Sequence, residues 1–184
     1  MSTLKLNNLE AATGTTINIA SGDKLTGAAG SIATPGSVIQ TLEGFDYTHA
    51  QSTSSTFADT GLSLAITPKF NTSKILIMVK HHFYAYNNAS AFGGLKLQKT
   101  IGATTSDVAM LDTLLCYAYQ TAFVLNATQN AVGFVLDSPA TTSQVTYKTQ
   151  FNLTNGTGEI NVNSDHTGSS ENSRASMILQ EIAQ

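Results

Sequence analysis

Residues 15–40 form a long stretch that is almost uncharged and carries glycine at short intervals. Its sequence is TTINIASGDKLTGAAGSIATPGSVIQ. Glycine at this density raises the entropy cost of ordering the backbone, so long regular elements are disfavoured. Residues 15–20 alternate polar and apolar side chains in the manner of a strand, but the few apolar residues cannot build a core. We therefore expect residues 1–36 to form an extended arm that is ordered by neighbouring surfaces.

The pattern from residue 37 to residue 184 is all-β. Polar and apolar residues alternate over residues 62–66 and 145–153, which is the period of a strand with one buried face. Residues 74–86 are apolar on both faces in the first half of the stretch, as in a strand covered by a layer on each side. About eight such strands, spaced roughly ten to twenty residues apart, predict a jelly-roll-like β-sandwich over residues 37–184.

Two local assignments need more than periodicity. Residues 108–125 have enough apolar side chains for an amphipathic helix, but Tyr117 and Tyr119 favour a strand and no capping sequence opens a helix. Asn155-Gly156 supplies the positive φ angles of a tight turn, which predicts a hairpin with residues 159–162. The predicted core residues are Ile66, Ile75, Ile77, Val79, Leu97, Phe134, Tyr147, Phe151 and Ile178.

The charge content excludes several classes of protein. Only 11% of the residues are charged and the net charge is −3, whereas soluble domains average roughly 25% charged residues. No basic patch is present to bind phosphates, so we expect no nucleic-acid partner. The longest apolar run, residues 75–79, is far shorter than the ~20 residues of a membrane helix. We therefore expect no membrane insertion, and the N-terminus lacks the apolar stretch of a signal peptide.

The residues that could carry chemistry do not form a recognisable site. Cys116 is the only cysteine and lies in an apolar context, which is typical of a buried structural thiol. His81 and His82 are adjacent in an expected strand and point to opposite faces, so they cannot chelate one metal together. A ring of either histidine around a three-fold axis is left open. The carboxylates show no glycosidase-like pairing. We expect no catalytic residues, no metal, no cofactor and no enzyme activity.

Aromatic side chains gather near residues 83–92 beside asparagine and serine. Aromatic rings stack on sugar faces while amides bind the hydroxyls, so this group could form a shallow glycan platform. The candidate glycan contacts are Tyr84, Tyr86 and Phe92. The alternative is that some of these rings face the core and the others line a subunit contact.

Three segments resemble one group of viral proteins. GTTINIASGDKLTGAAGSIATPGSVIQ (residues 14–40) is similar to the opening segment of bacteriophage tail-fibre and virion appendage proteins, especially those of marine and cyanobacterial phages. STSSTFADTGLSLAITPKFNTSKILIMV (residues 52–79) resembles the sandwich domain that follows it, and SMILQEIAQ (residues 176–184) resembles the last strand. Together they cover about half of the chain. Unlike long fibres, this chain has no heptads that would build a coiled-coil shaft.

The resemblance implies a virion structural protein that is assembled in the host bacterial cytoplasm. It also implies a homotrimer whose residues 1–36 dock on other virion proteins while the sandwich projects towards the host surface, where it could contact a glycan. The single cysteine, which permits no internal disulfide, fits a reducing cytoplasm. Two alternatives remain open: a capsid head decoration or cement protein, and a carbohydrate-binding module.

Overall fold

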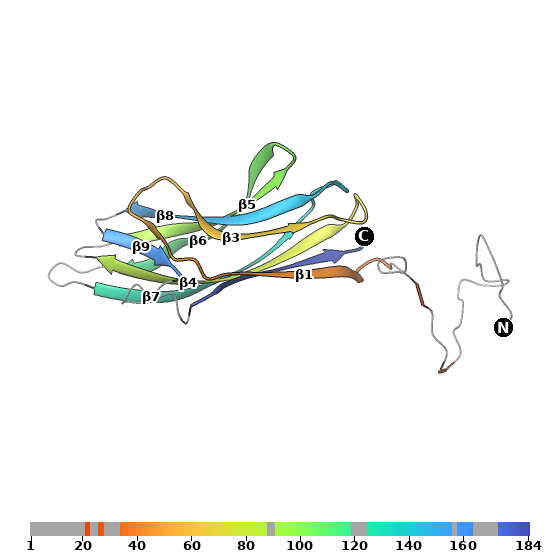
Figure 1. The fold of residues 1–184 in the computed structure, drawn as a ribbon, viewed down its shortest axis with the longest axis horizontal. Coiled ribbons are helices and arrows are strands. Elements are labelled where there is room, and N and C mark those ends of the chain that lie inside the picture. The colour runs from red at the N-terminus through yellow and green to blue at the C-terminus, as the bar shows by residue number, and fades with distance from the viewer. Residues whose placement is uncertain are drawn as a thin grey trace. The chain divides into compact units, whose positions relative to one another are not determined.

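The structure is a computed structural model that describes residues 21–22, 26–27, 34–87, 91–118, 125–155, 158–163 and 173–184. The chain divides into two units, Met1–Ile32 and Ala33–Gln184. The second unit contains all the strands described below (Figure 1). Most of the predicted arm, including its expected strand at residues 15–20, lies outside the described residues. The predicted domain boundary after residue 36 therefore stays a prediction.

Ten strands run through the described part of the second unit, and none of its described residues is helical. In chain order they are β1 (Val38–Asp46), β2 (Ala50–Ser52), β3 (Ala58–Ile66), β4 (Lys74–Asn87), β5 (Ala91–Ile101), β6 (Thr104–Ala118), β7 (Leu125–Asp137), β8 (Val145–Asn155), β9 (Gly158–Val162) and β10 (Ala175–Ile182).

The strands form two antiparallel sheets that pack as a sandwich (Figure 1). Sheet A has the order β1-β10-β4-β9-β2, with β7 paired to β4, and sheet B has the order β3-β8-β5-β6. If the two shortest strands, β2 and β9, are set aside, eight strands remain. Their spatial order is first, eighth, third, sixth in sheet A and second, seventh, fourth, fifth in sheet B. This is the double Greek-key order of a jelly roll, so the predicted fold is confirmed.

Strand β4 organises sheet A because it is long enough to serve two sets of neighbours. Its first half pairs with β10 and its second half with β9, while β7 runs along the opposite edge of both halves. The inward residues of the first half, Ile75, Ile77 and Val79, belong to one core cluster. Phe83 and Ala85, in the second half, belong to another. The sandwich therefore has two apolar cores placed one after the other along β4.

The predicted core is confirmed except at two positions. Ile178 is half-buried, and Phe134 is 69% exposed. The other predicted core residues are buried, each with 3% of its surface or less exposed: Ile66, Ile75, Ile77, Val79, Leu97, Tyr147, Phe151.

Phe134 is excluded from the core by the close approach of β6 to β7. The residues of β7 that face inward include Ala131 and Gly133, which are small. A Cβ atom at Gly133 would lie only 2.9 Å from Leu111 Cδ2 of β6. A large residue at an inward position here would separate the two strands. The apolar run at residues 132–136 has apolar side chains on both faces, so its periodicity did not show which face is buried.

The local assignments have different outcomes. Strand β6 confirms strand rather than helix up to Ala118, and residues 119–124 lie outside the described part. The hairpin predicted at Asn155-Gly156 is wrong, because β8 belongs to sheet B and β9 to sheet A. The connection crosses between the sheets instead of joining paired neighbours. The polar run over residues 48–56, which has no strand periodicity in the sequence, contains the short strand β2.

Gly93 and Gly94 lie inside β5, although the sequence suggests an interruption there. The pairing of β5 with β8 shifts register between Phe92 and Gly93. A Cβ atom at Gly93 would lie closer than 3.0 Å to the Asn152 carbonyl oxygen and to the Ile160 δ1 methyl. Glycine is needed here because it lets the backbones of the two sheets approach each other at the shift.

The chain enters the sandwich beside its last strand. The Gly36 amide donates to the Ala183 carbonyl at 2.8 Å, and the Ala183 amide donates to the Ser37 carbonyl at 2.9 Å. The buried Glu181 carboxylate accepts a bond of 2.7 Å from the Lys69 amide. The first two bonds fix the start of β1 to the end of β10, and the third ties the β3–β4 connection to β10.

Candidate assembly surface

The outward face of sheet A carries apolar side chains on four strands. Cross-strand pairing places Phe134 of β7 opposite Met78 of β4, and Met78 opposite Ile178 of β10. Leu136 lies opposite Leu76 in the next row. Residues paired across a sheet share a face, so these side chains form one continuous surface. We call this surface the apolar face, and its members are Val38, Leu76, Met78, Val132, Phe134, Leu136, Ile178 and Ile182.

The most exposed part of the apolar face lies on β7. Val132 is 55% exposed, Phe134 69% and Leu136 52%. The face contrasts with the usual sandwich, in which inward apolar residues alternate with outward polar ones. Single exposed apolar side chains are common on proteins, but a contiguous patch marks a site of interaction.

Polar groups border the apolar face and also lie within it. Thr41 and Gln180 lie in the row of Leu76 and Leu136, and His82 pairs across the strands with Asn130 at one end of the face. Two cations, Lys74 and Lys80, and one anion, Glu43, occupy outward positions within it. An apolar centre with a polar rim is the usual anatomy of a protein–protein interface.

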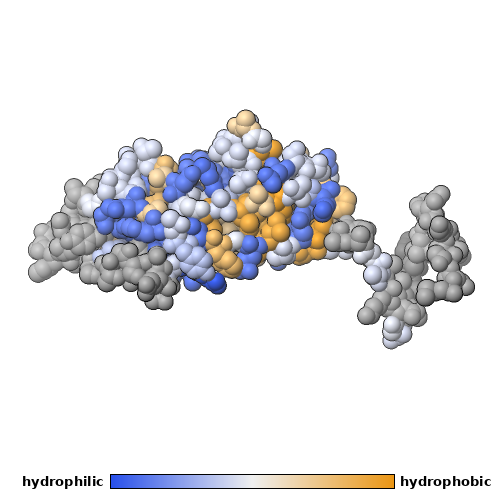
Figure 2. All heavy atoms as spheres, in the orientation of Figure 1, coloured by the Kyte–Doolittle hydropathy of each residue, from blue (hydrophilic) through white to orange (hydrophobic). Residues whose placement is uncertain are grey.

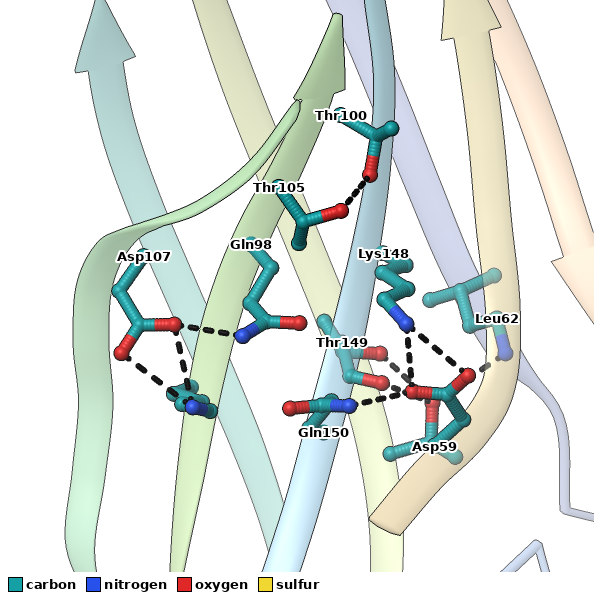
Figure 3. Close-up of polar contacts among 11 residues, drawn as sticks. Asp59, Leu62, Gln98, Thr100, Thr105, Asp107, Lys148, Thr149 and Gln150 are labelled. Carbon is teal, nitrogen blue, oxygen red and sulfur yellow. Dashed lines mark hydrogen bonds and ion pairs between the residues drawn. The ribbon is translucent and has the colours of Figure 1, made fainter. Parts of the chain in front are cut away.

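Sheet B presents the opposite character on its outward face (Figure 3). Asp107 accepts from Gln98 at 2.6 Å and forms an ion pair with Lys96 at 3.1 Å. These hydrogen bonds, first from Gln98 and then from Lys96, hold the pKa of Asp107 below its ordinary value. On the neighbouring strands, Asp59 accepts in the same way from Gln150 at 2.6 Å and pairs with Lys148 at 2.9 Å (Figure 3).

The two polar groups on sheet B are related by the pairing of β5 with β8. Lys96 lies opposite Gln150, and Gln98 lies opposite Lys148. Each aspartate thus binds the Lys and Gln of the strand beside it, and the central strands form an alternating array of amide and ammonium groups. This face is well solvated, since its charged groups are exposed or half-buried and paired. The sandwich is therefore polar on one outward face and apolar on the other.

The edge of the sandwich formed by β1 and β3 is partly apolar. Figure 2 shows apolar residues gathered between the two layers in the half of the sandwich nearer the C-terminus. Leu42 and Leu64, from the two edge strands, are partly buried and pack against the first core. Phe45, at 42% exposure, is covered by Arg174, whose guanidinium carbon lies 4.3 Å from the ring centre.

A buried polar group lies between the two sheets. His81 of β4 is fully buried, and its Nε2 is 2.9 Å from the Thr149 hydroxyl of β8. The Thr60 hydroxyl of β3 lies 2.7 Å from the same oxygen. His81 Nδ1 finds no hydrogen-bond partner among the described residues. Burial lowers the pKa of His81 from 6.5 to about 3, because the charged form would lose its hydration.

The predicted orientation of His81 and His82 towards opposite faces of the strand is confirmed. It excludes His81 from the alternative of a metal-binding ring around a three-fold axis. His81 points inward, whereas His82 is half-buried and its Nδ1 lies 3.3 Å from Asn130 Oδ1. His81 cannot face a symmetry axis from inside the core. Within the described residues, no three His, Cys, Asp or Glu side chains come together to hold a metal ion.

Cys116 is buried, as the sequence predicts. Burial, with a further contribution from the Asp112 charge, raises the pKa of its thiol to about 12. A thiol protonated at neutral pH is a weak nucleophile. The Cys116 backbone instead has a structural role, since its φ is 51° and its amide donates to Gln129 Oε1 at 2.6 Å. This bond connects β6 to β7 where the chain changes sheets.

The three candidate glycan residues have different surroundings. The ring of Tyr84 is 4% exposed, so in a single copy it offers little surface for stacking. The Tyr86 side chain lies outside the described atoms. Phe92 is half-buried, and its ring centre lies 5.9 Å from that of Tyr117, which is 57% exposed. Glycan contact stays a prediction, and Tyr117 is the exposed aromatic that sequence reasoning missed.

The apolar face was not predicted, although the apolar pattern of β4 indicates it. Residues 75–79 are apolar on both faces, and this pattern predicts a covering layer on each side. The structure supplies one such layer, sheet B, for the inward side chains. Leu76 and Met78 point the other way and are only half-buried. No described residue forms a helix with the length and apolar character to cross a membrane.

No family model matches the chain, and no curated protein matches it. Similar solved structures include infectious bursal disease virus Gt strain, at TM-score 0.41 and 10% identity over 88% of this chain and 43% of that chain. T=1 particles derived from infectious bursal virus give TM-score 0.34 and 10% identity over 88% and 41%. The VP2 subviral particle of infectious bursal disease virus gives 0.33 and 10% over 80% and 39%. The chain thus spans about two fifths of each neighbour. Similarity at this level carries no argument about function.

Proposed function

We propose that this chain is a structural protein of a virus particle, namely a bacteriophage tail fibre or fibre-like appendage. The observation that supports this best is a complete jelly roll whose two outward faces differ, one apolar and one polar. Such a domain is suited to packing on protein with one face while it presents the other to solvent. The role is non-enzymatic, needs no cofactor and is exercised through surfaces.

The segments that resemble appendage proteins lie in the centre of the fold. Residues 52–79 contain β3 and the first half of β4, and residues 176–184 contain most of β10. Strands β4 and β10 are neighbours in sheet A. The resemblance therefore concerns the framework of the sandwich as well as the arm. It supports a homo-oligomer, taken as a trimer, that is attached to other virion proteins through residues 1–36 and assembled in the bacterial cytoplasm.

The attachment role predicts the effect of removing the arm. A chain that starts at Thr34 should fold, because both core clusters lie wholly within residues 42–179. It should fail to join particles, with incorporation reduced at least about tenfold. Incorporation is measured by quantitative mass spectrometry of purified particles from cells that supply the shortened chain in place of the full one.

A control keeps loss of folding apart from loss of attachment. Circular dichroism should show the same strand content and the same melting temperature in the shortened chain. Incorporation at the level of the full chain would contradict attachment through the arm. Gold labelling of intact particles reports the location: label at the tail supports an appendage, and label over the head shell would show a decoration protein instead.

The glycan part of the proposal predicts a second effect. Replacing Tyr117 with alanine should remove the exposed half of the Phe92–Tyr117 ring pair and weaken glycan binding roughly fivefold, since a stacked ring contributes on the order of 1 kcal/mol. Binding is measured on an array of bacterial surface glycans. Tyr47→Ala is the matched control, because Tyr47 is equally exposed, at 55%, and lies elsewhere. Equal losses in both variants, or none, would count against a ring-pair platform.

A further inference from the structure

The apolar face of sheet A needs a covering layer that one copy of the sandwich does not supply. The first half of β4 buries Ile75, Ile77 and Val79 against sheet B. Its alternate residues, Leu76 and Met78, are as apolar as the buried ones yet face outward. Strands with apolar residues on both faces are found where layers cover both sides. The sequence of β4 is therefore that of a middle layer, and the single copy has only two layers.

We propose that a second copy of this chain covers the apolar face, so that sheet A packs against sheet A of a neighbouring copy. The inference goes beyond the virion role and does not depend on it. The face is the outer side of a twisted sheet, so a suitable partner is another sheet with the same twist. Two sheets meet these requirements when they pack at the usual separation of about 10 Å.

The size of the face suits this occupant. Its members lie on four strands about 4.8 Å apart and in four rows about 6.8 Å apart, which gives a face of roughly 500 Å² with the polar positions inside it included. Standard interfaces bury about 800 Å² on each partner, with an apolar centre and a polar rim. The apolar face thus has the size of the central part of such an interface, and His82 and Asn130 belong to its rim.

The charges of the face are compatible with a copy of itself. Its charged outward residues are Glu43, Lys74 and Lys80, since Lys74 lies opposite Ile182 and alternates with the inward Ile75. The face thus carries charges of both signs, and the carboxylate of one copy can pair with a lysine of the other. Partners related by symmetry present the same patch to each other, so a patch with apolar residues and charges of both signs can complement itself. Phe134, the most exposed large apolar residue of the face, is the expected anchor of the contact.

The first experiment measures the mass of the full chain in solution. One copy has a mass of 19.4 kDa, and we expect a multiple of this value by sedimentation. Phe134→Asp should give the mass of a single copy at the same concentration, with association weakened on the order of 30-fold or more. Leu114→Asp is the matched control, because Leu114 is 53% exposed on β6 of the other sheet. Its mass should equal that of the unchanged chain.

The second experiment identifies what lies on the face. A photoreactive benzophenone amino acid replaces Phe134 in the full chain, and the crosslinked peptides are identified by mass spectrometry. Crosslinks to peptides of β4, β7 or β10 from a second copy support the proposal. Crosslinks to residues 1–33 would overturn it, because the arm would then be the occupant. A single-copy mass for the unchanged chain, or an unchanged mass for Phe134→Asp, would also overturn it.

These outcomes are separate from those of the virion proposal. A chain that self-associates through the apolar face but never enters particles would retain this inference and lose the proposed function. A chain that enters particles as an oligomer held together by surfaces other than the apolar face would do the reverse.

Discussion

Gly93→Ala should destabilise the sandwich more than any other single methyl addition at the described glycines. The new Cβ atom would collide with the Asn152 carbonyl oxygen of β8 and with the Ile160 methyl of β9. The carbonyl belongs to the backbone, so neither a rotamer change nor a small shift relieves the collision. Overpacking of this kind costs about 1–3 kcal/mol and more where the backbone must move. We expect a loss of at least about 3 kcal/mol, measured as the change in free energy of unfolding in urea.

Gly102→Ala is the control for the general cost of replacing a glycine. Gly102 has a φ of 59° in the turn between β5 and β6, and no atom lies within 4 Å of the position that a new methyl group would take. The cost there is conformational strain alone, about 1 kcal/mol. If the two variants lost equal stability, the register shift in β5 would not depend on close approach of the backbones.

His81 should make the sandwich unstable in mild acid. Its pKa is about 3 in the folded protein and 6.5 when unfolded, so the unfolded chain takes up the proton first as the pH falls. Stability is therefore complete above pH 6.5 and is lost as the pH falls towards 3, by about 1.4 kcal/mol per pH unit. We expect a loss of about 2 kcal/mol between pH 6.5 and pH 5, measured by urea unfolding at each pH.

The variant His81→Asn isolates this contribution. Asparagine keeps a polar group near the Thr149 hydroxyl but does not titrate, so the loss between pH 6.5 and pH 5 should largely disappear even if the variant is less stable at every pH. His82→Asn, at the half-buried neighbour, should retain the loss. A steep loss that persists in His81→Asn would assign the acid sensitivity to other groups.

The jelly roll could be predicted because its strands have clear periodicity and its connections leave few other arrangements. Residues 62–66 and 145–153 alternate strictly, and both lie in strands of sheet B. The buried side chains of β4 were predicted for the same reason. Strand β6 was distinguished from a helix with the help of Tyr117, because aromatic side chains pack well on a pleated surface.

The errors arise where long-range packing overrides a local signal. Asn155-Gly156 has the chemistry of a hairpin turn, but turn chemistry does not specify which sheet receives the next strand. Phe134 is the largest residue in its run, yet Leu111 occupies the space that it would need inside. The local sequence does not specify the distance between β6 and β7. The apolar face had a visible signal in β4, and its location required the register with β7 and β10.

The bonds between Gly36, Ser37 and Ala183 hold the first and last described strands of the sandwich together. A fluorescent protein or affinity tag fused after Gln184 would therefore emerge next to Thr34, where the preceding residues leave the domain. Such a fusion would crowd any docking by those residues and could mimic a defective particle contact. Probes are better inserted in the turn at Gly102, whose neighbourhood is open.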